Sequence, residues 1–269
     1  MRGGFRAIWL APLLAFLALG AWAFASPVGS APDDDYHLVS IWCANGQSEH
    51  CAEGDSTHDR TVTAALPMLH CYAYDDQKSA SCQERIIESL SGQTTVTTRG
   101  NFVGEYPPLY YAVMGLFAGD NIIASAMVMR LLNVVLFVAV TSALFALLPP
   151  SRRGNLGLGW LMTLVPLGGF LVASNNPSGW AIVGVGSGWL ALLGYFEASG
   201  PRKLVLGAIF GLSVLVAAGS RGDAAFFMGG AIVSVIVLKA VWKRRFLLGA
   251  ILPAVGLIVA ALFFFAAGQ

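Results

Sequence analysis

The sequence predicts an all-α integral membrane protein of about seven transmembrane helices, with a disulfide-stapled extracytoplasmic loop and an interfacial helix after the first span. The chain of 269 residues is 56% hydrophobic and 12% charged, with a mean hydropathy of +0.68, whereas soluble domains carry about 25% charged residues. Apolar runs long enough to cross a bilayer recur along it. One polar segment, residues 26–106, interrupts them and holds 12 of the 15 acidic residues.

Residues 1–25 have a basic start and an apolar run of 18 residues from position 8. A cleavable signal peptide would look like this, and the closing Ala-Phe-Ala resembles a small-x-small cleavage site. An uncleaved membrane anchor of this length is the other interpretation. We favour the anchor because many spans follow. Both interpretations make residues 26–106 an extracytoplasmic loop.

All four cysteines lie in the polar segment, and an even number of cysteines in an exported region indicates disulfides. Of the three connectivities, we expect Cys43–Cys51 and Cys71–Cys82, because these pairs close short loops. A metal site built from cysteine and histidine is the alternative. The spacings C-x7-C and C-x10-C match no zinc pattern, and this disfavours it.

The rest of the polar segment is expected to be mostly irregular, with a short helix at 83–90 and a loop at 91–104. Residues 107–120 follow, beginning with two prolines of which the second suits a first helical turn. The apolar stretch 109–118 is too short to span a membrane. We interpret it as an interfacial helix whose tyrosines lie at the level of the lipid headgroups.

Residues 121–269 are predicted to be a polytopic membrane domain. Its hydrophobic segments lie at 121–148, 157–173, 180–196, 204–218, 224–238 and 246–267. The runs 204–218 and 224–238 are short, so a re-entrant pair is an alternative for them. The chain ends in an apolar run without a soluble tail, which fits either a shortened or a naturally minimal form.

Charge in the loops alternates along the chain. One set of loops and the N-terminus hold ten basic residues against the single acid Glu197: Arg2, Arg6, Arg152, Arg153, Arg202, Lys203, Lys239, Lys243, Arg244 and Arg245. The other set is nearly uncharged. The positive-inside rule then predicts a plasma-membrane protein with a cytoplasmic N-terminus and seven spans. The excess of acids in the polar segment argues against a nucleic-acid partner.

Candidate chemistry starts with the consecutive carboxylates of residues 33–35. Crowded carboxylates raise one another's pKa, attract cations and can serve as a general base, although a solvated helix start would use the same residues. Arg130 lies about nine residues into an apolar run, where a charge must be paired, face water or reach the interface. Arg221 lies in an outer loop, where it could bind a lipid-linked phosphate or simply pair with Asp223.

Four motifs occur in order: Pro32-Asp33-Asp34 with His37, Tyr106-Pro107-Pro108-Leu109-Tyr110-Tyr111, Arg130-Leu131-Leu132-Asn133 and Asn176-Pro177. Together they resemble the bacterial membrane family called domain of unknown function 2142, over nearly the whole chain. The first motif of that family reads approximately P-D-E-x-x-H, so Asp34 replaces the usual Glu.

More broadly, the chain is similar to the C-type glycosyltransferase superfamily, whose multi-pass members use polyprenyl-phosphate sugars. The resemblance implies that Asp33 or Asp34 is the catalytic base or a ligand of Mg²⁺ or Mn²⁺, with Glu105 as a second acid. The substrate-binding candidates are His37, Tyr106, Tyr110, Arg130 and Arg221, of which the two arginines would hold the donor phosphate.

These expectations describe an enzyme that moves a sugar from a polyprenyl-phosphate donor to a cell-envelope acceptor at the extracytoplasmic membrane face, in contact with membrane lipids. The alternative is a non-enzymatic transporter, flippase subunit or scaffold of the cell envelope. A transporter should carry its polar groups near the bilayer midplane. Here they gather at the outer face, which favours the transferase.

Overall fold

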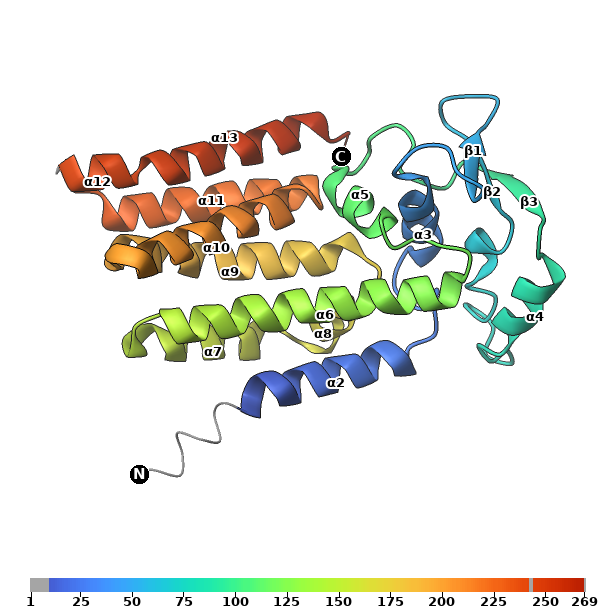
Figure 1. Cartoon of the computed structure of the whole chain (residues 1–269), viewed down its shortest axis with the longest axis horizontal. Coiled ribbons are helices and arrows are strands. Elements are labelled where there is room, and N and C mark those ends of the chain that lie inside the picture. The colour runs from blue at the N-terminus through green and yellow to red at the C-terminus, as the bar shows by residue number, and fades with distance from the viewer. Residues whose placement is uncertain (1–9, 242–243, 269) are drawn as a thin grey trace.

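Apolar helices form a bundle in the computed structural model, and the polar segment folds over one end of that bundle (Figure 1). The structure describes residues 10–241 and 244–268.

Within these residues, five helical stretches are long and apolar enough to cross a membrane. They are α6 (Ile122–Leu147), α9 (Pro177–Glu197), α10 (Gly200–Ala218), α11 (Gly222–Lys239) and the stretch Phe246–Ala266, which runs from α12 (Arg244–Gly249) into α13 (Ile251–Ala266). The first predicted span appears as α2 (Ala11–Ala25), and the start of that run lies outside the described residues. Together with a bent pair of helices described next, these elements confirm the prediction of about seven spans.

The predicted span 157–173 is wrong as a straight helix. It is a pair, α7 (Pro150–Thr163) and α8 (Pro166–Val172), whose axes differ by 99°. Pro166 is the cause, because it cannot donate a backbone hydrogen bond and it forces the preceding residue into an extended conformation. Val165 accordingly has ψ 163°.

The two short runs that suggested a re-entrant pair are instead full-length helices. α10 has 19 residues and α11 has 18, because each helix begins in polar residues ahead of its apolar run. Their connection at Gly219 is tight. A Cβ atom on Gly219 would lie 2.5 Å from the Leu109 side chain. Only glycine therefore lets the short helix that begins at Leu109 pack against this connection.

The polar segment contains short helices and a small antiparallel sheet, and it is not mainly loop. Its helices are α3 (Asp34–Cys43), the 3₁₀ turn η2 (Leu66–Met68) and α4 (Cys82–Ser89), and α4 confirms the predicted helix at 83–90. Strands β1 (Cys51–Glu53), β2 (Arg60–Thr63) and β3 (Thr94–Thr97) form an antiparallel sheet in the order β1-β2-β3. The expectation of a loop at 91–104 was therefore wrong for β3, whose four residues pair with a strand more than 30 positions away.

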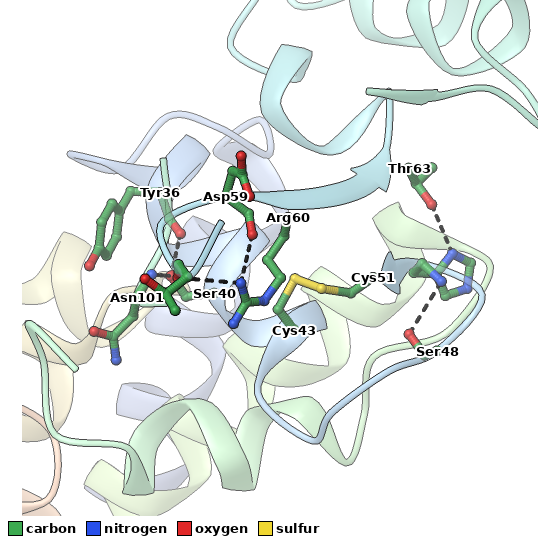
Figure 2. The surroundings of a disulfide bond; sticks show 11 residues. Tyr36, Ser40, Cys43, Ser48, Cys51, Asp59, Arg60, Thr63 and Asn101 are labelled. Carbon is green, nitrogen blue, oxygen red and sulfur yellow. Dashed lines mark hydrogen bonds between the residues drawn. A yellow bond between two sulfur atoms is a disulfide. The ribbon is translucent and has the colours of Figure 1, made fainter. Parts of the chain in front are cut away.

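Both predicted disulfides are confirmed. Cys43–Cys51 joins the end of α3 to the start of β1, as Figure 2 shows, and Cys71–Cys82 ties the chain after η2 to the start of α4. Each closes a short loop, and a cross-link of this size contributes about 2–3 kcal/mol to stability.

The core of the polar end is shared with the bundle. The predicted short helix after the two prolines is α5 (Leu109–Gly115), and it buries Tyr110, Tyr111 and Met114 instead of presenting both tyrosines to lipid headgroups. These side chains pack with the first two turns of α6, through Ile122 and Met129. Trp180 of α9 and Val216 of α10 complete the cluster. The polar segment is thus docked on the bundle by an apolar interface.

Candidate functional site

Three consecutive carboxylates at the start of α3 have three different environments. Asp33 precedes the helix in a left-handed conformation (φ 57°), which aspartate tolerates better than most residues. The side chains of Asp33, Asp34 and Asp35 are 60%, 0% and 18% exposed. The acidic motif is therefore divided between the surface and the interior.

Asp34 points into the protein. Its Oδ2 atom accepts hydrogen bonds from the backbone N–H groups of Gly29 (3.0 Å) and Ala31 (3.2 Å) and lies 3.7 Å from Nη2 of Arg130. Burial raises the pKa of Asp34 to about 6, although the Arg130 charge and the two backbone N–H groups act to lower it. The predicted catalytic or metal-binding carboxylate is thus closed off from solvent.

Arg130 lies in the same interior site. Its guanidinium donates to the backbone carbonyls of Ala23 (3.0 Å), Ser26 (2.6 Å) and Pro27 (3.0 Å), at the C-terminal end of α2. Unpaired carbonyls at a helix end attract a cation, so Arg130 fastens α6 to α2. Among the roles that its sequence position allowed, Arg130 therefore pairs with a carboxylate of the polar segment, Asp34.

Asn133 extends this network one turn further along α6. Its Nδ2 donates to the Ser174 carbonyl (2.7 Å), and its Oδ1 accepts from Trp180 Nε1 (2.8 Å). Tyr110, expected at headgroup level, is fully buried with its ring edge-on to Trp180 at 5.2 Å. We call Asp34, Arg130, Asn133 and Trp180 the buried cluster.

On the other side of α3, Arg99 binds the exposed carboxylate of Asp33 and the partly buried carboxylate of Asp35. Its Nη2 atom donates to Asp33 Oδ1 (2.7 Å), and its Nε and Nη2 atoms donate to Asp35. Burial alone would raise the pKa of Asp35, but the hydrogen bonds and charge of Arg99 outweigh it and hold that pKa below its usual value. The Arg99 guanidinium also lies 6.0 Å from the centre of the Tyr36 ring.

Tyr36 continues the contacts towards Glu105. The Tyr36 hydroxyl donates to Glu105 Oε2 (2.8 Å), and the Tyr36 ring lies 5.6 Å from that of Tyr106. Asn101 fixes this loop, because its side chain bonds both the N–H (2.8 Å) and the carbonyl (2.9 Å) of Tyr106, while its own N–H donates to Ser40 of α3 (Figure 2). Glu105 is exposed to solvent.

Arg221 completes this group from the bundle side. Its guanidinium lies 5.4 Å from the centre of the Tyr106 ring, donates to Ser178 Oγ (3.1 Å) and pairs with Asp223 (2.9 Å). Ser178 and Asp223 lie in the first turns of α9 and α11. We call this connected set, whose members other than the buried Tyr36 reach the surface, the open cluster: Asp33, Asp35, Tyr36, Arg99, Glu105, Tyr106 and Arg221.

His37 lies behind the open cluster and is 1% exposed. Its Nδ1 atom is 2.9 Å from the Tyr111 hydroxyl, and its ring is edge-on to Tyr106 at 5.5 Å. Burial lowers the pKa of His37 to about 4, so the imidazole is neutral at pH 7. As placed, His37 supports the Tyr106 ring.

The structure thus brings together four of the predicted site residues, Asp33, Glu105, Tyr106 and Arg221, with His37 beneath them. It separates Asp34, Tyr110 and Arg130 from these. Sequence reasoning missed Arg99, which lies in a predicted loop without a motif, and the roles of Tyr36 and Ser178. Tyr36 lies between the motif residues Asp34 and His37, and that position was a usable signal.

The predicted metal ligands do not converge. Asp33 is bound to Arg99, whereas Asp34 is bound to backbone amides in the interior. Among the residues that the structure describes, no three His, Cys, Asp or Glu side chains are grouped to hold one metal ion. A role for Mg²⁺ or Mn²⁺ remains a prediction that this arrangement does not support.

No curated protein and no solved structure matches the chain. A family model described as "Predicted membrane protein (DUF2142)" matches residues 16–269. The match begins within α2 and covers the polar segment and the remaining helices, including both clusters. The chain therefore belongs to the DUF2142 family of multi-pass membrane proteins, as its motifs indicated.

Proposed function

We propose that the protein is a membrane glycosyltransferase that moves a sugar from a polyprenyl-phosphate donor to a cell-envelope acceptor at the extracytoplasmic face. One observation carries the proposal. The open cluster combines exposed carboxylates, two arginines and tyrosine rings in one set of contacts, at the end of the spans that the polar segment covers. Transfer of a sugar from a lipid phosphate requires a base, a phosphate-binding cation and a surface for the sugar.

Glu105 is the candidate general base. Among the described residues, its one side-chain hydrogen bond comes from the neutral hydroxyl of Tyr36, whereas Asp33 is held by the charged guanidinium of Arg99. Glu105 would accept the proton of the acceptor hydroxyl while that oxygen attacks the anomeric carbon. The bond from the anomeric carbon to the phosphate oxygen breaks with inversion, and the lipid phosphate leaves with the electron pair.

Arg99 and Arg221 are the candidates for binding that phosphate, because guanidinium groups match phosphate oxygens in geometry and charge. Asp223 shares Arg221, so donor phosphate has to compete with this carboxylate. The Tyr106 ring is partly exposed next to Arg221 and offers a flat apolar face with a polar edge, which suits a sugar ring. The buried Tyr36 ring packs against it at 5.6 Å.

The test is transfer of radiolabelled sugar from a panel of polyprenyl-phosphate donors in membranes. Glu105→Gln is expected to lower the rate by about 10²–10⁴, the usual contribution of a general base. Asp33→Asn is expected to lower it less, through the position of Arg99. Glu84→Gln, an exposed carboxylate of α4 outside both clusters, is the matched control with wild-type activity. Equal transfer by wild type and Glu105→Gln would remove Glu105 from the mechanism.

One observation favours the transporter alternative. Broken helices are typical of transporters, and the α7–α8 pair is broken by 99°. The nearby Asn175 side chain is buried, and neither of its polar atoms has a hydrogen-bond partner among residues 10–241 and 244–268. A failure of transfer across the donor panel, combined with uptake of a polar solute by proteoliposomes that Asn175→Ala abolishes, would favour transport over transfer.

A further inference from the structure

The ends of α6, α9, α10 and α11 that lie opposite the polar segment are placed together in Figure 1, and the sequence there is rich in basic residues. Five basic residues with described side chains lie there, against the single acid Glu197: Arg152, Arg153, Arg202, Lys203 and Lys239. An excess of positive charge at the ends of membrane helices attracts anionic lipid headgroups.

Four of these five cations already have partners. Arg152 and Lys239 both bind Glu197, at 2.7 Å and 2.5 Å. Arg153 and Arg202 donate to backbone carbonyls at the C-terminal end of α6, at Leu148 (3.1 Å) and Leu147. These contacts satisfy the helix end, and they leave Lys203 to be explained.

Lys203 has no carboxylate within ion-pair distance among the described residues. Its Nζ atom lies 4.4 Å from the centre of the Tyr195 ring and borders a cavity of about 290 Å³. The cavity is also lined by the ion pair of Lys239 with Glu197 and by the apolar side chains of Val241, Phe196 and Phe246. The rings of Phe196 and Phe246 stack at 5.3 Å. The cavity therefore presents ammonium groups next to aromatic and aliphatic surface.

We propose that this cavity binds the headgroup of an anionic phospholipid, with the phosphate at Lys203 and the first methylene groups against Phe196 and Phe246. Its place at the ends of α9, α10 and α11 puts it where membrane lipid is the most abundant phosphate. Glu197 also lines the cavity, but it is paired with Arg152 and Lys239, which leaves the Lys203 charge for the phosphate. The inference stands independently of the sugar-transfer proposal.

The test is native mass spectrometry of the full chain in detergent, titrated with phosphatidylglycerol or with phosphatidylcholine of the same acyl chains. Wild type is expected to bind phosphatidylglycerol more tightly, since the choline group brings a positive charge of its own. Lys203→Gln is expected to weaken phosphatidylglycerol binding about fivefold, the contribution of one lysine near a lipid surface. Lys203→Arg, which keeps the charge, is expected to retain most of it.

Lys78→Gln is the matched control, because it removes one lysine charge from the polar segment, where Lys78 pairs with Asp75. It is expected to leave lipid binding unchanged. Equal affinity of wild type for the two lipids would overturn the proposal, and this comparison needs no variant to fold. An equal loss in Lys78→Gln and Lys203→Gln would also overturn it, because net charge alone would then explain the binding.

Discussion

The two clusters on either side of α3 each contain an aspartate–arginine pair, but one pair is exposed and the other is buried. The open cluster pairs Asp33 with Arg99 at the surface, with both side chains at least half exposed. The buried cluster pairs Asp34 with Arg130, with neither side chain exposed. Exposed pairs contribute little to stability and remain available to a ligand. Buried pairs are costly to break and inaccessible. Adjacent aspartates in one motif therefore have separate roles.

The largest effect should come from the buried cluster. Arg130→Gln leaves the Asp34 carboxylate without its cation and the α2 carbonyls without their donor, so we expect a destabilisation of about 3–5 kcal/mol. Thermal unfolding in detergent, with the yield of monodisperse protein, measures this. Arg221→Gln is the control at the open cluster and should cost less than about 1 kcal/mol. Similar losses in both variants would erase the distinction between the clusters.

The next effect is a pH dependence of stability, which has opposite signs for Asp34 and His37 in the same helix. The pKa of His37 falls from 6.5 to about 4 on folding, so between these values only the unfolded chain binds the proton. The contribution of His37 to the free energy of unfolding is complete above pH 6.5 and is lost as the pH falls through about 4. The pKa of Asp34 rises from 3.8 to about 6, so its contribution is complete below pH 3.8 and is lost as pH rises through 6.

Each contribution amounts to about 3 kcal/mol, and in wild type the two largely cancel between pH 4 and 6. Relative to wild type, His37→Asn should become more stable as pH falls through this window, and Asp34→Asn should become more stable as pH rises. Thermal unfolding at pH 4, 5 and 6 checks both. Parallel profiles for the two variants would contradict the opposite environments of these side chains.

The smallest effect is expected at the surface pair itself. Arg99→Lys keeps the charge but loses the two-pronged contact with Asp35, and should cost less than about 1 kcal/mol of stability. Sugar transfer, if the proposal holds, should fall by a larger factor than this stability change explains. Unfolding and transfer are measured on the same preparation, and a loss of stability above 2 kcal/mol would place Arg99 among the structural residues.

Much of this arrangement was predictable from sequence. Apolar runs located the spans, and short loops between cysteines located both disulfides. Local patterns failed where the partner is distant. β3 has four residues and no apolar alternation, so only its pairing with β2 defines it. The three consecutive aspartates carried no sign of which one faces Arg130, because burial depends on a helix about 100 residues further along the chain.

The sequence also misled us about which of the predicted spans are continuous helices. Length alone made α10 and α11 suspect, whereas Pro166 inside the run 157–173 was the feature that mattered. The predicted position of Tyr110 was wrong for a related reason. A tyrosine beside a membrane helix suggests the lipid interface, but α5 turns Tyr110 inward against Trp180. Both errors arise because each segment was interpreted alone, without the helices against which it packs.

The contact between Arg130 and the end of α2 also sets an order of events during synthesis. The carbonyl of Ser26 and the guanidinium that binds it are 104 residues apart. At about 5–20 residues per second, a ribosome needs roughly 5–20 s to make that stretch. During this interval α2 has left the ribosome and still lacks its clamp, while the polar segment with its four cysteines is being completed. The contact that joins α2 to α6 therefore forms only after α6 has emerged from the ribosome.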